Sequence, residues 1–425
     1  MIKYIKNLRQ NELARGSLIL IIFIAIGNLL SYIFQFSMAR VLGPVDYGIL
    51  AVLTSIIAIF GIASVSIQTV ISQNTTNFNS KKEYGKIKGM LKSASKSVFL
   101  VATLSFLLYL IVSIFIYRPL GIPYSLLALT GAFIFGAFLY PITAGILQGM
   151  KKFSSLGFNF VINCLIKLVV GVLLVAFGFK VYGAVIGFIS GTIIAFLLVF
   201  FTLKEIKNVK EIDGKVSIFS RYNFYPLVAM LLVVLLYSLD VVFAKIFFSP
   251  EIAGKYAVIS MIGKIILFIV MSVGNVMLPI STEKFANGEK TRSTLKKALL
   301  LSLLICLFFL ALFFIFPELI IQILFGFQYS SMYNILFYVG VAFSFISLLS
   351  LLVLYEISLN RFRFFHLLSL IFFLALQITL FYYSNLTIDS FSFYFMLSSI
   401  IAFIGILAVF MLLKLKNGQI INNNV

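Results

Sequence analysis

Charged residues inside two apolar segments point to anion binding within a membrane. Lys167 follows Asn159 and Asn163 at intervals of four residues, which places the three side chains on one face of a helix. Lys264 lies on the same face of its predicted helix as Asn275. A lysine buried in a bilayer costs roughly 2.5 to 3.5 kcal/mol on insertion scales, so it tends to face water or a partner. Two ammonium groups lining an internal cavity would suit a phosphate or pyrophosphate, which favours an anionic lipid-linked cargo.

Asp240 lies in another apolar segment, and two interpretations of it stay open. Its carboxylate could bind a coupling proton or cation, or it could pair with a nearby base. Amide side chains also follow helical faces elsewhere: Asn28 and Gln35 in the first apolar segment, and Gln68 in the second. Such groups can instead bond one helix to another for about 0.6 to 2 kcal/mol each, without any substrate.

Arg40 borders a predicted outer turn, where a long basic side chain can also simply reach the membrane interface. Both interpretations of Arg40 stay open. We expect an ion-coupling role for Asp240 and substrate-binding roles for a larger set of basic and amide side chains. The candidate substrate-binding residues are Lys167, Lys264, Arg40, Asn28, Gln35, Gln68, Asn159, Asn163 and Asn275.

The composition excludes a water-soluble fold. Hydrophobic residues make up 62% of the 425 residues and charged residues 11%, so polar side chains could not cover the surface of a soluble protein of this size. Crossing about 30 Å of hydrocarbon takes roughly 20 helical residues, and the apolar runs have that length without the alternation of barrel strands. The expected fold class is an all-α polytopic membrane protein.

About twelve apolar runs have the length of a transmembrane helix. Passing them alternately across the membrane puts most of the 33 lysine and arginine residues in cytoplasmic loops, as the positive-inside rule requires. Both chain ends then lie in the cytoplasm, and we expect a multi-pass protein of the cell membrane. The predicted spans are residues 17–38, 47–71, 93–117, 123–147, 155–177, 181–203, 223–247, 256–280, 298–316, 333–354, 364–383 and 391–413.

A short polar turn occurs twice in the chain. It lies at residues 39–48 and returns at 244–254, about 206 residues later, with a base, an apolar pair, Pro, an acid and Gly in the same order. Each half contains six predicted spans, so both halves start in the cytoplasm and would be related by an axis along the membrane normal. The polar run 204–221 is the natural boundary. We therefore expect two six-helix bundles as parallel repeats, residues 1–210 and 211–425.

Motifs that the sequence lacks narrow the class of function. The chain contains no Gly-rich phosphate loop with Lys-Ser/Thr and no His/Cys metal cluster, and every predicted outer loop is short. We expect no enzymatic activity, no cofactor, and transport driven by an ion, a membrane potential or the substrate's own gradient. The net charge of +20 lies largely in short loops beside the spans, where topology and anionic membrane lipid explain it better than nucleic acid does.

Three motifs carry a resemblance to a known family. They are ARVLGPVDYG at 39–48, LQGMKKF at 147–153 and GFKVYGA at 178–184. With these motifs the chain resembles the Wzx-type flippases of polysaccharides or oligosaccharides, within the superfamily that includes multidrug and toxin extrusion transporters and lipid II flippases. It departs from the lipid II flippases in the first predicted span, whose middle carries no basic residue.

The resemblance implies two six-helix bundles around a central cavity that opens alternately to the two sides of the membrane. It implies that the cargo is a polyprenyl-(pyro)phosphate-linked oligosaccharide, flipped to the outer leaflet for surface polysaccharide or glycan assembly. Lys167, Lys264 and Arg40 would engage the pyrophosphate. Glycan polymerases or glycosyltransferases are then the expected protein partners. The alternative is a cation-coupled exporter of drugs or metabolites with the same fold, for which a dominant buried carboxylate would be the sign.

Overall fold

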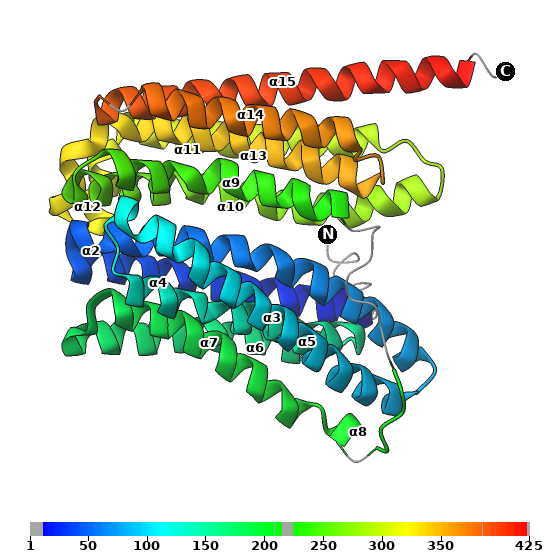
Figure 1. Ribbon diagram of the computed structural model, residues 1–425. Helices are drawn as coiled ribbons and strands as arrows, with labels where there is room; N and C mark the ends of the chain where they lie inside the picture. Colours follow the sequence, from blue (N-terminus) through cyan, green and yellow to red (C-terminus); the bar gives the residue numbers. More distant parts are fainter. Residues whose placement is uncertain (1–11, 208, 215–223, 385, 423–425) are drawn as a thin grey trace. The chain divides into compact units, whose positions relative to one another are not determined.

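The computed structural model (Figure 1) describes residues 12–207, 209–214, 224–384 and 386–422, and most of these lie in helices. No strand occurs in these ranges. Long helices satisfy every backbone polar group within one segment, which is what the interior of a bilayer demands. The all-α membrane fold expected from the apolar runs is confirmed.

The chain divides into two compact units, Met1–Arg221 and Tyr222–Val425, which we call the first and second bundles. The first contains α2 (Glu12–Ser80), α3 (Tyr84–Leu120), α4 (Tyr124–Gly131), α5 (Phe133–Gly149), α6 (Phe153–Leu174), the π-turn η1 (Val175–Phe179), α7 (Lys180–Thr202) and α8 (Lys204–Lys207). The second contains α9 (Phe224–Phe247), α10 (Pro250–Ala286), α11 (Arg292–Ile315), α12 (Pro317–Phe325), the 3₁₀ segment η3 (Phe327–Ile335), α13 (Leu336–Ser358), α14 (Phe364–Tyr383) and α15 (Ile388–Asn422).

Two helical arms of α2 meet at Gly43. This residue has φ 73° and ψ 174°, outside the helical region, and Pro44 after it has no backbone N–H to donate. The hydroxyl of Tyr47 donates to Oε1 of Gln35 over 3.5 Å, although twelve residues of straight helix would separate them by about 18 Å. The chain therefore reverses its direction at Gly43, inside the turn predicted at 39–48.

A second reversal joins α6 to α7 through η1. Gly178 and Lys180 there have φ of 90° and 48°, in the left-handed region. Beyond this point α7 packs back along α6. The close approach of the two helices is seen at Gly187, where an added Cβ would lie 2.8 Å from the carbonyl oxygen of Lys167.

These reversals account for the number of membrane crossings. Ten helices in the described part of the chain are long and apolar enough to span a membrane. Two of them, Ile19–Ser80 and Phe153–Thr202, are 62 and 50 residues long, and one crossing takes roughly 20 residues. Each holds one of the two reversals and so counts as two crossings. The described residues thus contain twelve crossings, six in each bundle.

The segment 209–214, expected to belong to a linker, is packed onto the start of α3. The backbone N–H of Ile212 donates to the carbonyl oxygen of Gly85 over 3.1 Å, and Nζ of Lys88 donates to the carbonyl oxygen of Val209 over 2.9 Å. Lys92 and Glu211 form an ion pair at 2.9 Å. The first part of the polar run 204–221 is therefore an ordered part of the first bundle. The boundary at 210/211 stays a prediction.

A glycine at position 89 makes this packing possible, and an alanine there should disrupt it. A Cβ at Gly89 would overlap the carbonyl oxygen of Ile212. We expect Gly89→Ala to weaken the docking of 209–214 by about 1–3 kcal/mol, the usual cost of overpacking. Trypsin should then cleave after the exposed Lys210 roughly tenfold faster in detergent.

Gly61→Ala is the matched control for this substitution. Gly61 also lies within a helix, but no heavy atom lies within 4 Å of a Cβ built there. Alanine favours helix over glycine by about 1 kcal/mol, so Gly61→Ala should be cleaved at the native rate and melt no lower. Cleavage of Gly89→Ala at the native rate would show that docking does not depend on this close approach.

Candidate functional site

Lys167 lies deep within the first bundle. It is fourteen residues after the start of α6 at Phe153 and twelve before the end of η1 at Phe179. These separations correspond to about 21 and 18 Å of helix, so Lys167 lies near the middle of the crossing, far from both interfaces. Its Nζ donates a hydrogen bond to Oγ of Ser31 on α2 over 2.9 Å. The same hydroxyl donates in turn to Sγ of Cys164 over 3.5 Å. The ammonium on α6 is thus hydrogen-bonded to α2.

Two aromatic rings flank the Lys167 ammonium. Nζ lies 5.4 Å from the ring centroid of Phe34 and 5.0 Å from that of Phe188. The two rings meet edge to face, with centroids 5.2 Å apart and planes at 85°. The negative faces of aromatic rings attract cations, by up to about 2 kcal/mol where water is excluded. These rings stabilise the charge of Lys167 without neutralising it.

Glycines in α7 bring Phe188 to this position. Added Cβ atoms at Gly187 and Gly191 would lie 2.8 Å from the carbonyl oxygen of Lys167 and 2.7 Å from that of Asn163. Only the absence of side chains lets α7 approach α6 so closely. These two glycines of α7 thus let Phe188 lie against the lysine.

The Lys167 ammonium keeps hydrogen-bonding capacity for a ligand. An ammonium has three N–H donors, and Ser31 accepts from one of them. No described Asp or Glu lies within ion-pairing distance of Lys167. The group is therefore a net positive charge with unused donors, which suits the oxygens of a phosphate.

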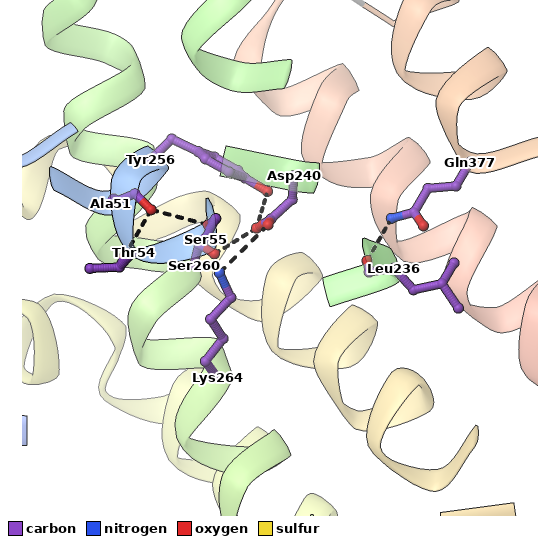
Figure 2. Close-up of polar contacts among 9 residues, drawn as sticks. All are labelled: Ala51, Thr54, Ser55, Leu236, Asp240, Tyr256, Ser260, Lys264 and Gln377. Atoms are coloured by element: carbon purple, nitrogen blue, oxygen red, sulfur yellow. Dashed lines mark hydrogen bonds and ion pairs between the residues drawn. The ribbon is translucent and has the colours of Figure 1, made fainter. Parts of the chain in front are cut away.

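The second bundle holds its charge differently, as an ion pair. Nζ of Lys264 on α10 lies 3.7 Å from Oδ1 of Asp240 on α9 (Figure 2). The other carboxylate oxygen, Oδ2, accepts from Oγ of Ser260 over 2.5 Å and from the hydroxyl of Tyr256 over 3.3 Å. The Lys264 ammonium also lies 5.6 Å from the ring centroid of Phe343. The two opposite charges make this cluster neutral overall.

Equivalent positions in the two repeats make related contacts with different charge. Gln35 and Asp240 lie five residues before the bases Arg40 and Lys245 of the repeated turn. Each accepts from a tyrosine hydroxyl on the following arm or helix.

A second equivalent contact joins the fifth crossing of each bundle to the first. Lys167 donates to Ser31, which lies nine residues before Arg40. Nε2 of Gln377 on α14 donates to the carbonyl oxygen of Leu236, nine residues before Lys245, over 3.1 Å (Figure 2). The first bundle carries a cation where the second carries a neutral amide.

The other predicted residues are spread over several places in the bundles. Asn159 is buried and donates to the carbonyl oxygen of Ala195 over 2.8 Å, which is the helix-bonding alternative. Nε2 of Gln68 donates to Oε1 of Gln148 over 2.9 Å. The exposed predicted residues are Asn28, Arg40 and Asn275. None of these contacts joins a predicted amide to Lys167, and their roles in binding stay predictions.

The sequence indicated some residues of the two clusters and gave no signal for others. Ser31 shares the helical face of Asn28 and Gln35, so periodicity indicated it. Phe34 and Phe188 are two of 48 phenylalanines, and no spacing separates them from the rest. The pairing of Lys264 with Asp240 was one of two open interpretations of that carboxylate, and the structure shows the pair.

Comparison with known proteins shows which family the chain belongs to. A sequence profile of the family described as polysaccharide biosynthesis protein matches residues 13–285, more than half of the chain. The chain belongs to this family. The expected relationship to proteins of polysaccharide assembly is thereby confirmed. No protein of curated function matches the sequence at a significant level.

Solved structures similar to this member of the polysaccharide biosynthesis family share its fold. The lipid II flippase MurJ in an inward closed conformation has a TM-score of 0.68 at 16% identity, over 93% of this chain and 87% of that one. The eukaryotic MATE transporter AtDTX14 has a TM-score of 0.62 at 15% identity, over 95% and 97%. A transporter of the MOP superfamily from Pyrococcus furiosus has a TM-score of 0.56 at 15% identity, over 95% and 96%. The chain has the all-helical fold of these membrane transporters.

The two lysines should affect stability in opposite directions. Lys264→Met leaves the carboxylate of Asp240, which is 0% exposed, without its cation, and breaking a buried pair in this way costs about 3–5 kcal/mol. Lys167→Met removes a charge that no described carboxylate balances, so thermal unfolding in detergent should occur at the native temperature or above. The melting temperature of Lys264→Met should fall by several degrees.

The double variant Asp240→Asn/Lys264→Met serves as the control for the ion pair. It removes both charges together, so it should recover most of the stability that Lys264→Met loses. If Lys264→Met melts like the native protein, or the double variant melts no higher than the single one, the pair does not compensate the buried carboxylate.

Proposed function

We propose that this protein flips a polyprenyl-(pyro)phosphate-linked oligosaccharide from the cytoplasmic to the outer leaflet by alternating access, for surface polysaccharide or glycan assembly. Membership of the polysaccharide biosynthesis family and the transporter fold support this proposal. The observation that carries it is the Lys167 ammonium, a net positive charge with unused donors about halfway along a membrane crossing.

The charge distribution favours an anionic headgroup as the cargo. A phosphate can enter a low-dielectric interior only if an opposite charge meets it there. Lys167 can supply that charge, whereas the Lys264–Asp240 pair is neutral while it stays intact. The headgroup is therefore expected to bind first to Lys167, in the first bundle. Lys264 and Arg40 remain additional candidates for the pyrophosphate.

Amide side chains suit the sugar part of the same cargo, because they can donate to and accept from hydroxyl groups. Asn163 lies one helical turn before Lys167, so it is the best placed for a sugar next to the phosphate. The remaining candidates for sugar contacts are Asn28, Gln35, Gln68, Asn159 and Asn275. We further propose that the chain lies in the cell membrane with both ends in the cytoplasm. It would act there with glycosyltransferases or a glycan polymerase.

A cation-coupled exporter of drugs or metabolites is the second candidate. The fully buried carboxylate of Asp240 favours it, because such a group can bind a proton or cation. The ammonium of Lys264 already lies 3.7 Å from that carboxylate, so an incoming cation would have to displace it. This makes the anionic cargo the better supported of the two.

Transport of a labelled polyprenyl-pyrophosphate disaccharide into reconstituted liposomes tests the proposal. We expect the native protein to move this lipid and Lys167→Gln to move it at least about tenfold more slowly, since a charge-assisted hydrogen bond contributes roughly 1.5–3 kcal/mol. Lys167→Arg keeps the positive charge and should retain part of the rate.

Lys290→Gln is the control with the same loss of charge. Lys290 is exposed between α10 and α11, so its removal should leave the rate unchanged at equal protein density. If Lys167→Gln transports at the native rate, Lys167 is not the headgroup site. If the native protein moves only cationic drugs and no pyrophosphate lipid, it is an exporter.

A further inference from the structure

The two side chains of the Lys264–Asp240 pair in the second bundle differ in exposure. The side chain of Lys264 is 12% exposed, and that of Asp240 is 0% exposed. Part of the Lys264 side chain is therefore exposed, whereas no part of the Asp240 side chain is. At 3.7 Å the ammonium is farther from Oδ1 than the distance of about 2.8 Å typical of a charge-assisted hydrogen bond. The ion pair is therefore a loose one.

The carboxylate of Asp240 keeps other partners when the ammonium leaves. Ser260 and Tyr256 both donate to Oδ2, and neither bond involves Lys264. Hydrogen bonds from hydroxyl groups stabilise the charged form of a buried carboxylate. Asp240 is thus held independently of Lys264, which lowers the cost of separating the two charges.

We propose that Asp240 determines headgroup specificity: it withholds Lys264 from weakly charged ligands and releases it to a pyrophosphate, so that the protein discriminates pyrophosphate lipids from monophosphate lipids. This inference rests on the proposed function. A pyrophosphate carries more negative charge and more acceptor oxygens than a monophosphate, so it competes better with a carboxylate for one ammonium.

The carboxylate that withholds the lysine is found in the second bundle and not at the equivalent position of the first. The position equivalent to Asp240 in the first bundle is Gln35, a neutral amide that also accepts from a tyrosine. No described carboxylate pairs with Lys167, so none competes with a phosphate for its ammonium. Initial binding at Lys167 and discrimination at Lys264 are therefore separate tasks carried by separate bundles.

Calorimetric binding of farnesyl pyrophosphate and farnesyl phosphate to the full chain in detergent tests this inference. The native protein should prefer the pyrophosphate. Asp240→Asn keeps the shape of the side chain but frees Lys264, so the monophosphate should bind about fivefold or more tighter and the preference should narrow, a coupling of the usual size between sites. In the double variant Asp240→Asn/Lys264→Gln this gain in affinity for the monophosphate should vanish.

Ser260→Ala tests the same inference by strengthening the hold of Asp240 on Lys264, so it should weaken lipid binding where Asp240→Asn strengthens it. Without the Ser260 hydroxyl the carboxylate depends more on Lys264, so pyrophosphate should bind more weakly than to the native protein. This variant keeps its Cβ and leaves both charges in place, and thermal unfolding checks that each variant is folded. Equal affinities of native protein and Asp240→Asn for both lipids, or a gain that persists without Lys264, would overturn the inference.

Lys167→Gln separates this inference from the proposed function. If the native protein binds farnesyl pyrophosphate, Lys167→Gln does not, and Asp240→Asn changes nothing, the inference about Asp240 is wrong while the headgroup site stands. If neither the native protein nor Asp240→Asn binds either lipid, both the headgroup site and the role of Asp240 are wrong.

Discussion

A charge placed in hydrocarbon has to be stabilised by its immediate neighbours, and the two bundles meet this requirement in different ways. In the first bundle the faces of Phe34 and Phe188 and one hydroxyl surround the ammonium of Lys167. In the second bundle a carboxylate pairs with Lys264. Aromatic faces lower the energy of a cation but leave its charge intact, whereas a carboxylate cancels it. The electrostatic character of each bundle follows from this choice of neighbours.

The choice in the first bundle depends on backbone packing. Phe188 reaches Lys167 because Gly187 and Gly191 let α7 approach the backbone of α6. The approach in turn requires the chain to reverse at Gly178, where a left-handed backbone is needed. Three glycines without any chemistry of their own thus prepare the surroundings of Lys167. Backbone packing thus fixes the surroundings of the Lys167 ammonium.

The fold could be predicted from the sequence in nearly every crossing, because a helix in a bilayer must be about 20 apolar residues long whatever its neighbours are. Both reversals lie between predicted spans, one in the polar turn at 39–48 and the other at residues 178–180, between the spans 155–177 and 181–203. The site was less predictable. Lys167, Lys264 and Asp240 are conspicuous in apolar surroundings, but which charge pairs with which depends on helix packing, and periodicity along one helix carries no information about the next. Phe34 and Phe188 show the same limit, since only distance distinguishes them from the other phenylalanines.

The difference between the repeats also bears on how a transporter can release its cargo. A site that conducts must bind strongly enough to accept a ligand and weakly enough to let it leave. An uncompensated Lys264 would attract an anion with no internal competitor, and that attraction would have to be overcome at every turnover. If Asp240 controls Lys264 as proposed, the ammonium would return to its own carboxylate as an anion leaves it. The internal acid therefore offsets part of the cost of release. This gives a physical reason for a duplicated protein to keep a carboxylate in one repeat and the amide of Gln35 in the other.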